Sequence, residues 1–465
     1  MATILWTYIP KEVEIEMKSL AEELEARGHS LFIVYHSNTE ILKKWKVNAF
    51  PSKNFSINKD DGSANELLEK WGDRVFRWGA FKGQDPDKTI KNLHSYYHDI
   101  LEKTSPDLVV IWNPMSYTYG ILGDVARSKG VKCLYSERGL VSPGFFLDMD
   151  GVFGYSSIKS TGKEFFDRPD YKALGLSYLK KLDVDSLSLY KQEGRIEKKI
   201  TKNSRERKIL ILGSHEMQCG MHPPESNDRK KVLPFFTGNE EMVIYLLQEI
   251  DNAIVIFKPH PHSDINLSEL IDNKNFFVSN SNPNSLIAIS DVVISNCSKL
   301  EMNVVAKNKP LVLPGFGLLW NKGCAYDAGS KAEFSELVSE CLKKHSKADE
   351  FFDALTGYLG FIIKDQHFLG KFSFENNVSS EADDIKGFAD YFLDRLELSR
   401  YGNGKIELSA HVFIRDQLLD NNFVYSSLKD LFRVEVPNIY RFMTFFSPKR
   451  YFLKIKKILN SLGGL

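Results

Sequence analysis

The segment Lys258-Pro259-His260-Pro261-His262 combines basic side chains with two prolines, directly after the apolar run at 253–257. A short run rich in β-branched residues is typical of a buried strand. Such a strand would deliver the basic turn to the edge of a sheet, where open α/β sheets bind their ligands. Prolines restrict the backbone of the turn, and lysine and histidine both bind phosphate. The segment therefore predicts a phosphate-binding turn that uses Lys258 and His260.

A second candidate segment, residues 295–301, follows the apolar run at 292–294, so a strand is expected to end there and a helix to begin. Ser298 is well placed to cap that helix, and the N–H groups beside it would bind a phosphate. Glu301, in the first helical turn, could accept hydrogen bonds from ribose hydroxyls. It could also form a capping box with Ser298, and the two roles are compatible.

A carboxylate is expected to face these two segments from the first half of the chain. Glu137 follows the predicted strand at 131–135, next to Arg138, and would face the two phosphate-binding segments across a cleft between the halves of the chain. A surface ion pair between the two residues is the alternative interpretation.

The loop at 213–222 follows the first strand of the second half and contains His215, Cys219 and His222. Histidine and cysteine bind zinc, but this spacing matches no usual zinc pattern and a fourth ligand is missing. A polar loop that lines the cleft is the favoured interpretation.

Strands and helices alternate in both halves of the chain. In the first half, strands at 3–6 and 31–35 enclose a helix that ends at Gly28, which predicts a parallel sheet with a right-handed crossover. A new series of strands and helices begins at 208–213. The two halves predict an α/β fold of GT-B type, in which two Rossmann-like domains with parallel sheets face a cleft.

We expect an acceptor domain over residues 1–200, a nucleotide-sugar donor domain over 201–345 and a helical C-terminal extension over 346–465. The pattern Gly-x-x-x-x-Gly-Lys-Ser/Thr is missing, which argues against a P-loop ATPase. No Gly-x-Gly-x-x-Gly run follows the first strand, which argues against a dinucleotide-dependent oxidoreductase. Phosphate-binding loops in one half and a carboxylate in the other are typical of a GT-B glycosyltransferase.

Composition limits the partners of the chain. The formal net charge of its 465 residues is +0, so bulk attraction to nucleic acid is not expected. The N-terminus lacks the pattern of a signal peptide, and no apolar run is long enough to span a bilayer. The five cysteines are scattered and odd in number, which favours reduced thiols and a cytoplasmic protein.

Residues 441–459 mix large apolar side chains with charges that are all basic. This composition fits an interfacial helix on an anionic membrane, which would place the protein on the inner face of the cytoplasmic membrane. A terminal helix that packs on its own domain with a solvated basic face fits equally well.

In their order and spacing, these motifs resemble the capsule polysaccharide biosynthesis family, which includes bacterial Kdo transferases that use CMP-Kdo. The resemblance runs from about Pro106 to Gly329. It is carried by Val110-Ile111-Trp112-Asn113, Ser136-Glu137-Arg138-Gly139, Pro143, Asp148-Met149-Asp150-Gly151-Val152, Gly213, Lys258-Pro259-His260-Pro261, the segment 295–301, Lys309-Pro310 and Gly315.

The resemblance implies that Glu137 is the general acid/base and that Lys258, His260, Ser298 and Glu301 hold the cytidine phosphate. The carboxylate of a Kdo-type donor needs a cation, for which Arg138 and Lys258 are candidates. CMP leaves without metal assistance, so no metal or other cofactor is expected. The expected acceptor is a cell-surface polysaccharide, such as capsule or lipopolysaccharide O-antigen, or a lipid-linked glycan.

One departure from the family concerns the expected nucleophile. The Kdo transferases of this family carry an aspartate in the loop after the first strand of the second half, where this chain has His215-Glu216-Met217-Gln218-Cys219. Glu216 could substitute, since either carboxylate can form a glycosyl ester. Asp148 is a weaker alternative.

Three other functions stay open. A CDP-polyol phosphotransferase of the teichoic-acid type also combines His-Pro and serine-rich helix starts in a GT-B fold. A sialyltransferase or another nonulosonate transferase would use a related donor. A non-catalytic scaffold in a capsule or lipopolysaccharide assembly complex would account for the missing aspartate.

Overall fold

The computed structural model describes most of the two predicted Rossmann-like halves. It covers residues 1–8, 14–35, 43–48, 64–77, 83–141, 145–181, 200, 206–222, 224, 229–263, 265, 267, 270, 272–344, 346–363 and 367–368. The chain divides into two compact units, 1–390 and 391–465, and all the described residues belong to the first. The predicted interfacial segment 441–459 lies outside the described residues.

None of the described helices combines the length and the apolar character needed to cross a lipid bilayer.

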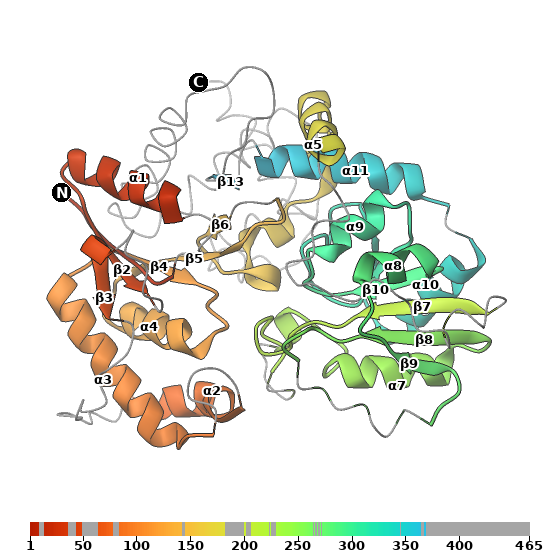
Figure 1. Cartoon of the computed structure of the whole chain (residues 1–465), viewed down its shortest axis with the longest axis horizontal. Coiled ribbons are helices and arrows are strands. Elements are labelled where there is room, and N and C mark those ends of the chain that lie inside the picture. Colours follow the sequence, from red (N-terminus) through yellow and green to blue (C-terminus); the bar gives the residue numbers. More distant parts are fainter. Residues whose placement is uncertain are drawn as a thin grey trace, which may run out of the picture. The chain divides into compact units, whose positions relative to one another are not determined.

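The first half forms a seven-stranded sheet in the order β13-β6-β5-β4-β1-β2-β3 (Figure 1). Strands β1 to β5 pair in parallel, whereas β6 and β13 are antiparallel at one edge. With β2 on one side of β1 and β4 on the other, the order is that of a Rossmann fold. The strands are β1 (Thr3–Trp6), β2 (Ser30–Tyr35), β3 (Lys46–Asn48), β4 (Leu108–Trp112), β5 (Lys132–Arg138), β6 (Phe145–Asp148) and β13 (His367–Phe368).

Five α-helices accompany this sheet in the described part of the first half. They are α1 (Glu14–Ala26), α2 (Ala64–Arg77), α3 (Pro86–Thr104), α4 (Tyr117–Ser128) and α5 (Pro169–Lys181). In α3, Asp85 caps the N-terminus through the N–H of Asp87, and Pro86 occupies the first turn, where its missing N–H costs nothing. Short 3-10 helices are η2 (Lys43–Trp45), η3 (Phe153–Tyr155), η4 (Ser157–Ser160) and η5 (Lys163–Phe165).

The second half forms a six-stranded sheet in the order β12-β11-β10-β7-β8-β9, and every pair is parallel. Its strands are β7 (Arg207–Leu212), β8 (Ala253–Lys258), β9 (Phe276–Val278), β10 (Val292–Ser295), β11 (Leu311–Leu313) and β12 (Tyr326–Asp327). Its helices are η7 (Arg229–Lys231), α7 (Asn239–Glu249), α8 (Pro283–Ile289), α9 (Leu300–Ala306), α10 (Lys331–Lys343) and α11 (Ala348–Phe361).

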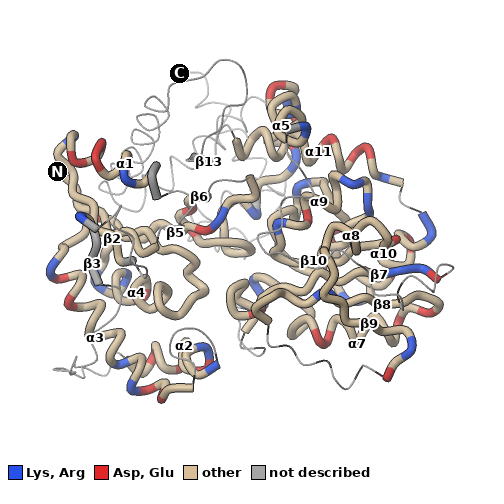
Figure 2. Tube along the Cα trace, viewed as in Figure 1, with Lys and Arg blue, Asp and Glu red and all other residues tan. Residues whose placement is uncertain are grey.

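Apolar strand interiors explain why both sheets could be predicted. Strands β4, β10 and β11 are fully buried and carry no charged residue, and Figure 2 shows most charges on helices, loops and strand ends such as that of β7. Parallel sheets covered on both faces need such continuous apolar strands. The α/β class and the GT-B architecture of two Rossmann-like halves are confirmed. The predicted boundaries at 200/201 and 345/346 stay a prediction, although β13 returns the chain to the first sheet after α11.

Helices α5 and α11 cross at very short range (Figure 1). A β-carbon at Gly175 of α5 would overlap the carbonyl oxygen of Thr356, and one at Gly360 would overlap that of Tyr171. The two glycines therefore let the backbones of the helices touch. This crossing ties α11, which follows the second sheet, to a helix of the first half.

The substitution Gly175→Ala should destabilise the protein, because the clash is with backbone and cannot be relieved by a rotamer change. We expect the free energy of unfolding to fall by about 1–3 kcal/mol or more. Gly123→Ala in α4 is the control, since its β-carbon would make ordinary contact with Ile111 at 3.4 Å. Denaturant unfolding of both variants tests this, and equal stability would contradict the close crossing.

Candidate functional site

A cavity of about 290 Å³ is lined by loops that follow the carboxyl ends of strands in both sheets. We call it the candidate site. From the first half it receives Trp112, Asn113, Glu137 and Arg138; from the second it receives His215, Gln218, His260, Ser298 and Lys299. In each sheet the strand that comes first in the sequence, β1 or β7, lies between two later strands. The loops after β4, β7 and β10 leave the sheets beside these strands. Rossmann-like sheets bind ligands at this switch point.

Glu137 is a buried carboxyl group near the end of β5 and lines the candidate site. Its Oε1 accepts the backbone N–H of Arg138 at 2.8 Å. Burial raises the pKa of Glu137, while Arg138, Lys299 and a hydrogen bond from Asn113 lower it. A carboxylate whose pKa is raised is a stronger base toward a bound hydroxyl than an exposed carboxylate is.

Asn113 holds an unusual backbone conformation beside Glu137. Its φ is 40°, which an L-residue rarely adopts, and its Oδ1 accepts the N–H of Met115 at 3.1 Å. Its own N–H donates to Ser136 O at 2.7 Å, which joins the loop after β4 to β5. Strained backbone of this kind persists only where the surrounding contacts hold it. Here it aims a side-chain amide at the carboxyl group of Glu137.

His260 lines the candidate site after β8, as the basic turn predicted. Burial lowers its pKa to about 4, and the neighbouring His215, His262 and Lys258 act in the same direction. The ring of His260 is thus neutral at pH 7. Its Nδ1 accepts the N–H of His262 at 3.2 Å, so the proton of the neutral ring lies on Nε2. His260 can therefore donate a hydrogen bond to an anionic oxygen without carrying a charge.

Lys258 lies behind the turn instead of in the cavity. Its side chain is buried, its Nζ lies 3.5 Å from Pro259 O, and it is not among the residues that line the candidate site. Its effect on that cavity is electrostatic, through the pKa of His260.

Ser298 and Glu301 form half of the predicted capping box, because the helix α9 is capped at Lys299 and the side chain of Ser298 does not accept the N–H of Glu301. Oε1 of Glu301 accepts the N–H of Ser298 at 2.9 Å, and Oγ of Ser298 accepts the N–H of Leu300 at 3.2 Å. Ser298 lines the candidate site, whereas Glu301 is fully buried and does not. Burial raises the pKa of Glu301 to about 7. The capping role of Glu301 is thus observed, and its predicted contact with a ribose stays a prediction.

The two predicted alternatives for a nucleophile lie outside the candidate site. Oε1 of Glu216 accepts two hydrogen bonds from Asn239, at the start of α7, from N at 2.7 Å and from Nδ2 at 3.0 Å. Asp148 accepts hydrogen bonds from the backbone of Asp150, Gly151 and Ser157 and from the hydroxyls of Ser156 and Ser157. Asp148 lines a separate small cavity. Both carboxylates are engaged in holding loops, and their predicted catalytic roles are untested.

Several residues of the candidate site were not assigned a role from the sequence. The rings of His215 and His260 meet edge to face with centroids 5.4 Å apart, and Nδ1 of His215 accepts the N–H of Gln218 at 3.2 Å. Lys299 faces Glu137 closely enough to lower its pKa. Its position next to Ser298, a predicted site residue, could have identified Lys299 from the sequence. His222, a candidate zinc ligand in the sequence together with His215 and Cys219, forms a hydrogen bond with Asp73 and does not line the candidate site.

No protein-family model matches this sequence, and no curated protein matches it at a significant level. Similar solved structures include two chains of KpsC from Thermosulfurimonas dismutans. The β-Kdo 2,4 transferase has 16% identity and a TM-score of 0.37, over 54% of this chain and 79% of that one. The β-Kdo 2,7 transferase has 13% identity and a TM-score of 0.38, over 83% and 99%.

The S. aureus MnaA structure with UDP has 12% identity and a TM-score of 0.35, over 85% of this chain and 97% of that one. At these identities and TM-scores, the likenesses decide neither substrate nor reaction. The predicted membership of the capsule polysaccharide biosynthesis family stays a prediction.

Glu301→Gln should make stability less dependent on pH. The raised pKa means that native Glu301 holds a proton between about pH 4.5 and 7 that the unfolded chain has lost, so its contribution to stability falls as pH rises through that window. Each pKa unit corresponds to about 1.4 kcal/mol. The variant should therefore gain stability relative to wild type between pH 5 and pH 8.

Denaturant unfolding at both pH values measures this change. Glu336→Gln, at an exposed position of α10, serves as the control. A difference between Glu301→Gln and wild type that is the same at both pH values would show that the buried carboxyl group does not titrate in this range.

Proposed function

We propose that this chain is a glycosyltransferase that moves an acidic sugar, Kdo or a related nonulosonate, from its CMP-activated form to a cell-surface or lipid-linked glycan. The observation that carries the proposal is a single cavity with a buried carboxyl group from the first sheet and, from the second, groups suited to bind a phosphate. The cytidine nucleotide and the acidic sugar rest on the resemblance of the sequence motifs.

The second half supplies the donor side of the proposed reaction. His260 donates a hydrogen bond from Nε2 to the phosphate, and Ser298 and Lys299 lie in the same cavity. These groups stabilise the charge that develops on the phosphate oxygen as CMP leaves. Arg138 lines the cavity beside Glu137 and pairs with the carboxylate of the sugar.

Glu137 acts as the general base. It takes the proton of the acceptor hydroxyl while the hydroxyl oxygen attacks the anomeric carbon and the bond from that carbon to the phosphate oxygen breaks. Among the described residues that line the candidate site, Glu137 is the only carboxylate. We therefore favour a single displacement, which inverts the anomeric centre, over a double displacement through Glu216.

The first test of this proposal is nucleotide binding. CMP should raise the melting temperature, because a ligand that binds only the native state stabilises it. UDP and GDP should raise it less, because the proposed donor carries CMP. His260→Ala should reduce that rise by removing the Nε2 donor, whereas His29→Ala, far from the candidate site in sequence and not among its lining residues, should not. If CMP leaves the melting temperature unchanged, a non-catalytic scaffold is the better assignment.

The second test separates the roles of the two glutamates. With CMP-Kdo as donor, Glu137→Gln should lower kcat by roughly 10²–10⁴-fold with little change in CMP affinity, as expected for loss of a general base. Glu216→Gln should cost far less, because an amide oxygen can still accept the hydrogen bonds from Asn239. Near-wild-type kcat in Glu137→Gln would refute the assignment of Glu137. A collapse in Glu216→Gln alone would favour double displacement.

A further inference from the structure

A second cavity, of about 260 Å³, lies along α2, α4 and β5 and shares none of its lining residues with the candidate site. We call it the basic pocket. Among its described lining residues, four are basic and one is acidic: Lys70, Arg74, Arg127 and Lys231 against Asp150. The proposed catalytic steps use none of these residues.

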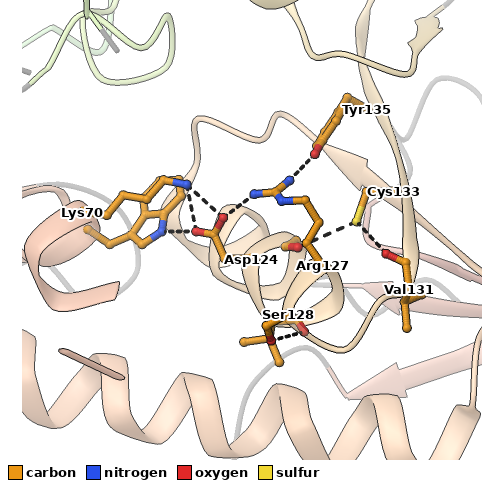
Figure 3. A network of polar contacts seen from close by, with 10 residues as sticks. Lys70, Asp124, Arg127, Ser128, Val131, Cys133 and Tyr135 are labelled. Atoms are coloured by element: carbon orange, nitrogen blue, oxygen red, sulfur yellow. Dashed lines mark hydrogen bonds and ion pairs between the residues drawn. The ribbon is translucent and has the colours of Figure 1, made fainter. Parts of the chain in front are cut away.

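The basic side chains are held in place by specific contacts (Figure 3). Asp124 accepts hydrogen bonds from Nζ of Lys70 at 2.9 and 3.0 Å and from Nε1 of Trp71 at 2.7 Å. Arg127 donates to the same carboxylate and to the hydroxyl of Tyr135. One carboxylate thus orients two cations, and its single negative charge cannot neutralise both.

Arg74 and Lys231 extend this arrangement. Arg74 is buried, and its guanidinium donates to the carbonyl oxygens of His222 at 2.6 and 3.0 Å and of Met115 at 3.0 Å. These carbonyl oxygens orient the guanidinium at the wall of the basic pocket. Nζ of Lys231 lies 5.3 Å from the centre of the Tyr155 ring. Arg74 is buried, whereas Lys70 and Lys231 are exposed at the rim of the cavity, and cationic side chains gathered in this way favour an anionic ligand.

Aromatic rings complete the walls of the basic pocket. Trp71, Tyr135 and Tyr155 line it beside the cations. Gly120 is required for this packing, because a β-carbon there would overlap the Trp71 ring and the carbonyl oxygen of Pro114. Flat apolar faces next to a few fixed polar groups suit a sugar ring that carries a charged substituent.

The basic pocket lies beside the proposed general base. Tyr135 and Glu137 are two residues apart on β5, so they share one face of the strand and are separated by about 7 Å. The loop after β4 likewise supplies Asn113 to the candidate site and Met115 to the basic pocket. A ligand held in the basic pocket by its anionic group could therefore present a hydroxyl to Glu137.

We propose that the basic pocket binds the carboxylate or phosphate of an anionic acceptor glycan and so positions its hydroxyl for transfer. This assignment rests on the proposed function, because it takes the candidate site to be the donor site. The proposed donor site uses His260, Ser298 and Lys299 for the phosphate, so the basic pocket, which shares none of these residues, is assigned to the second substrate.

Ligand-observed NMR titrations of the full chain test the proposal, with glucuronate, glucose 6-phosphate and neutral glucose as probes. At least one anionic sugar should bind more tightly than glucose. Preference for glucuronate would identify a carboxylate ligand, preference for glucose 6-phosphate a phosphate ligand, and both support the shared chemistry. The double variant Lys70→Gln/Lys231→Gln should weaken the preferred probe by about tenfold or more, as expected for lost charged hydrogen bonds. Lys230→Gln, at the exposed neighbouring position, should not.

The same samples are titrated with CMP, which separates the two claims. Failure of CMP to bind would refute the proposed donor site and leave the anion titration to be judged by itself. The acceptor proposal is overturned if glucose binds as tightly as the anionic sugars, if the double variant binds them like wild type, or if saturating CMP displaces them competitively.

Discussion

The parallel pairing of β1 with β4 and of β7 with β10 is the constraint on which the rest of the structure depends. In each sheet the chain leaves the first strand toward one side and later returns to pair on the other, so the loops at these carboxyl ends diverge. The candidate site is lined by the loops after β4, β7 and β10, together with those after β5 and β8. Backbone pairing thus collects residues that are up to about two hundred positions apart in the sequence.

That arrangement also sets the electrostatics of the cavity. Glu137 is buried and its pKa is raised, while the pKa of His260 is lowered to about 4 by burial and by neighbouring basic side chains. Each group is therefore held closer to its neutral form than it would be in water. A neutral histidine with its proton on Nε2 can donate a hydrogen bond to an anionic oxygen, and a carboxylate with a raised pKa is a stronger base than one in water.

The sequence predicted what local patterns determine and failed where contacts cross the fold. Continuous apolar runs identified β8 and β10, and the spacing of Ser298 and Glu301 identified the hydrogen bond between them, because these signals lie within a few residues. The contacts of Glu216 were not predictable in this way, since Asn239 is 23 positions away and becomes its neighbour only through the packing of α7. Lys299 gained its importance from facing Glu137 across the cavity, which no local pattern encodes.

Strand β5 supplies residues to both pockets, Tyr135 to the basic pocket and Glu137 to the candidate site, and its two-residue period allows both. Alternation places Tyr135 and Glu137 on the same face, while Ser136 points to the other face and is completely buried. A substitution that shifted the register of β5 by one residue would exchange these faces and remove both Tyr135 and Glu137 from their cavities at once. Pairing with β4 in parallel and with β6 antiparallel fixes that register from both sides. The precision of the proposed transfer therefore depends on the sheet more than on either pocket alone.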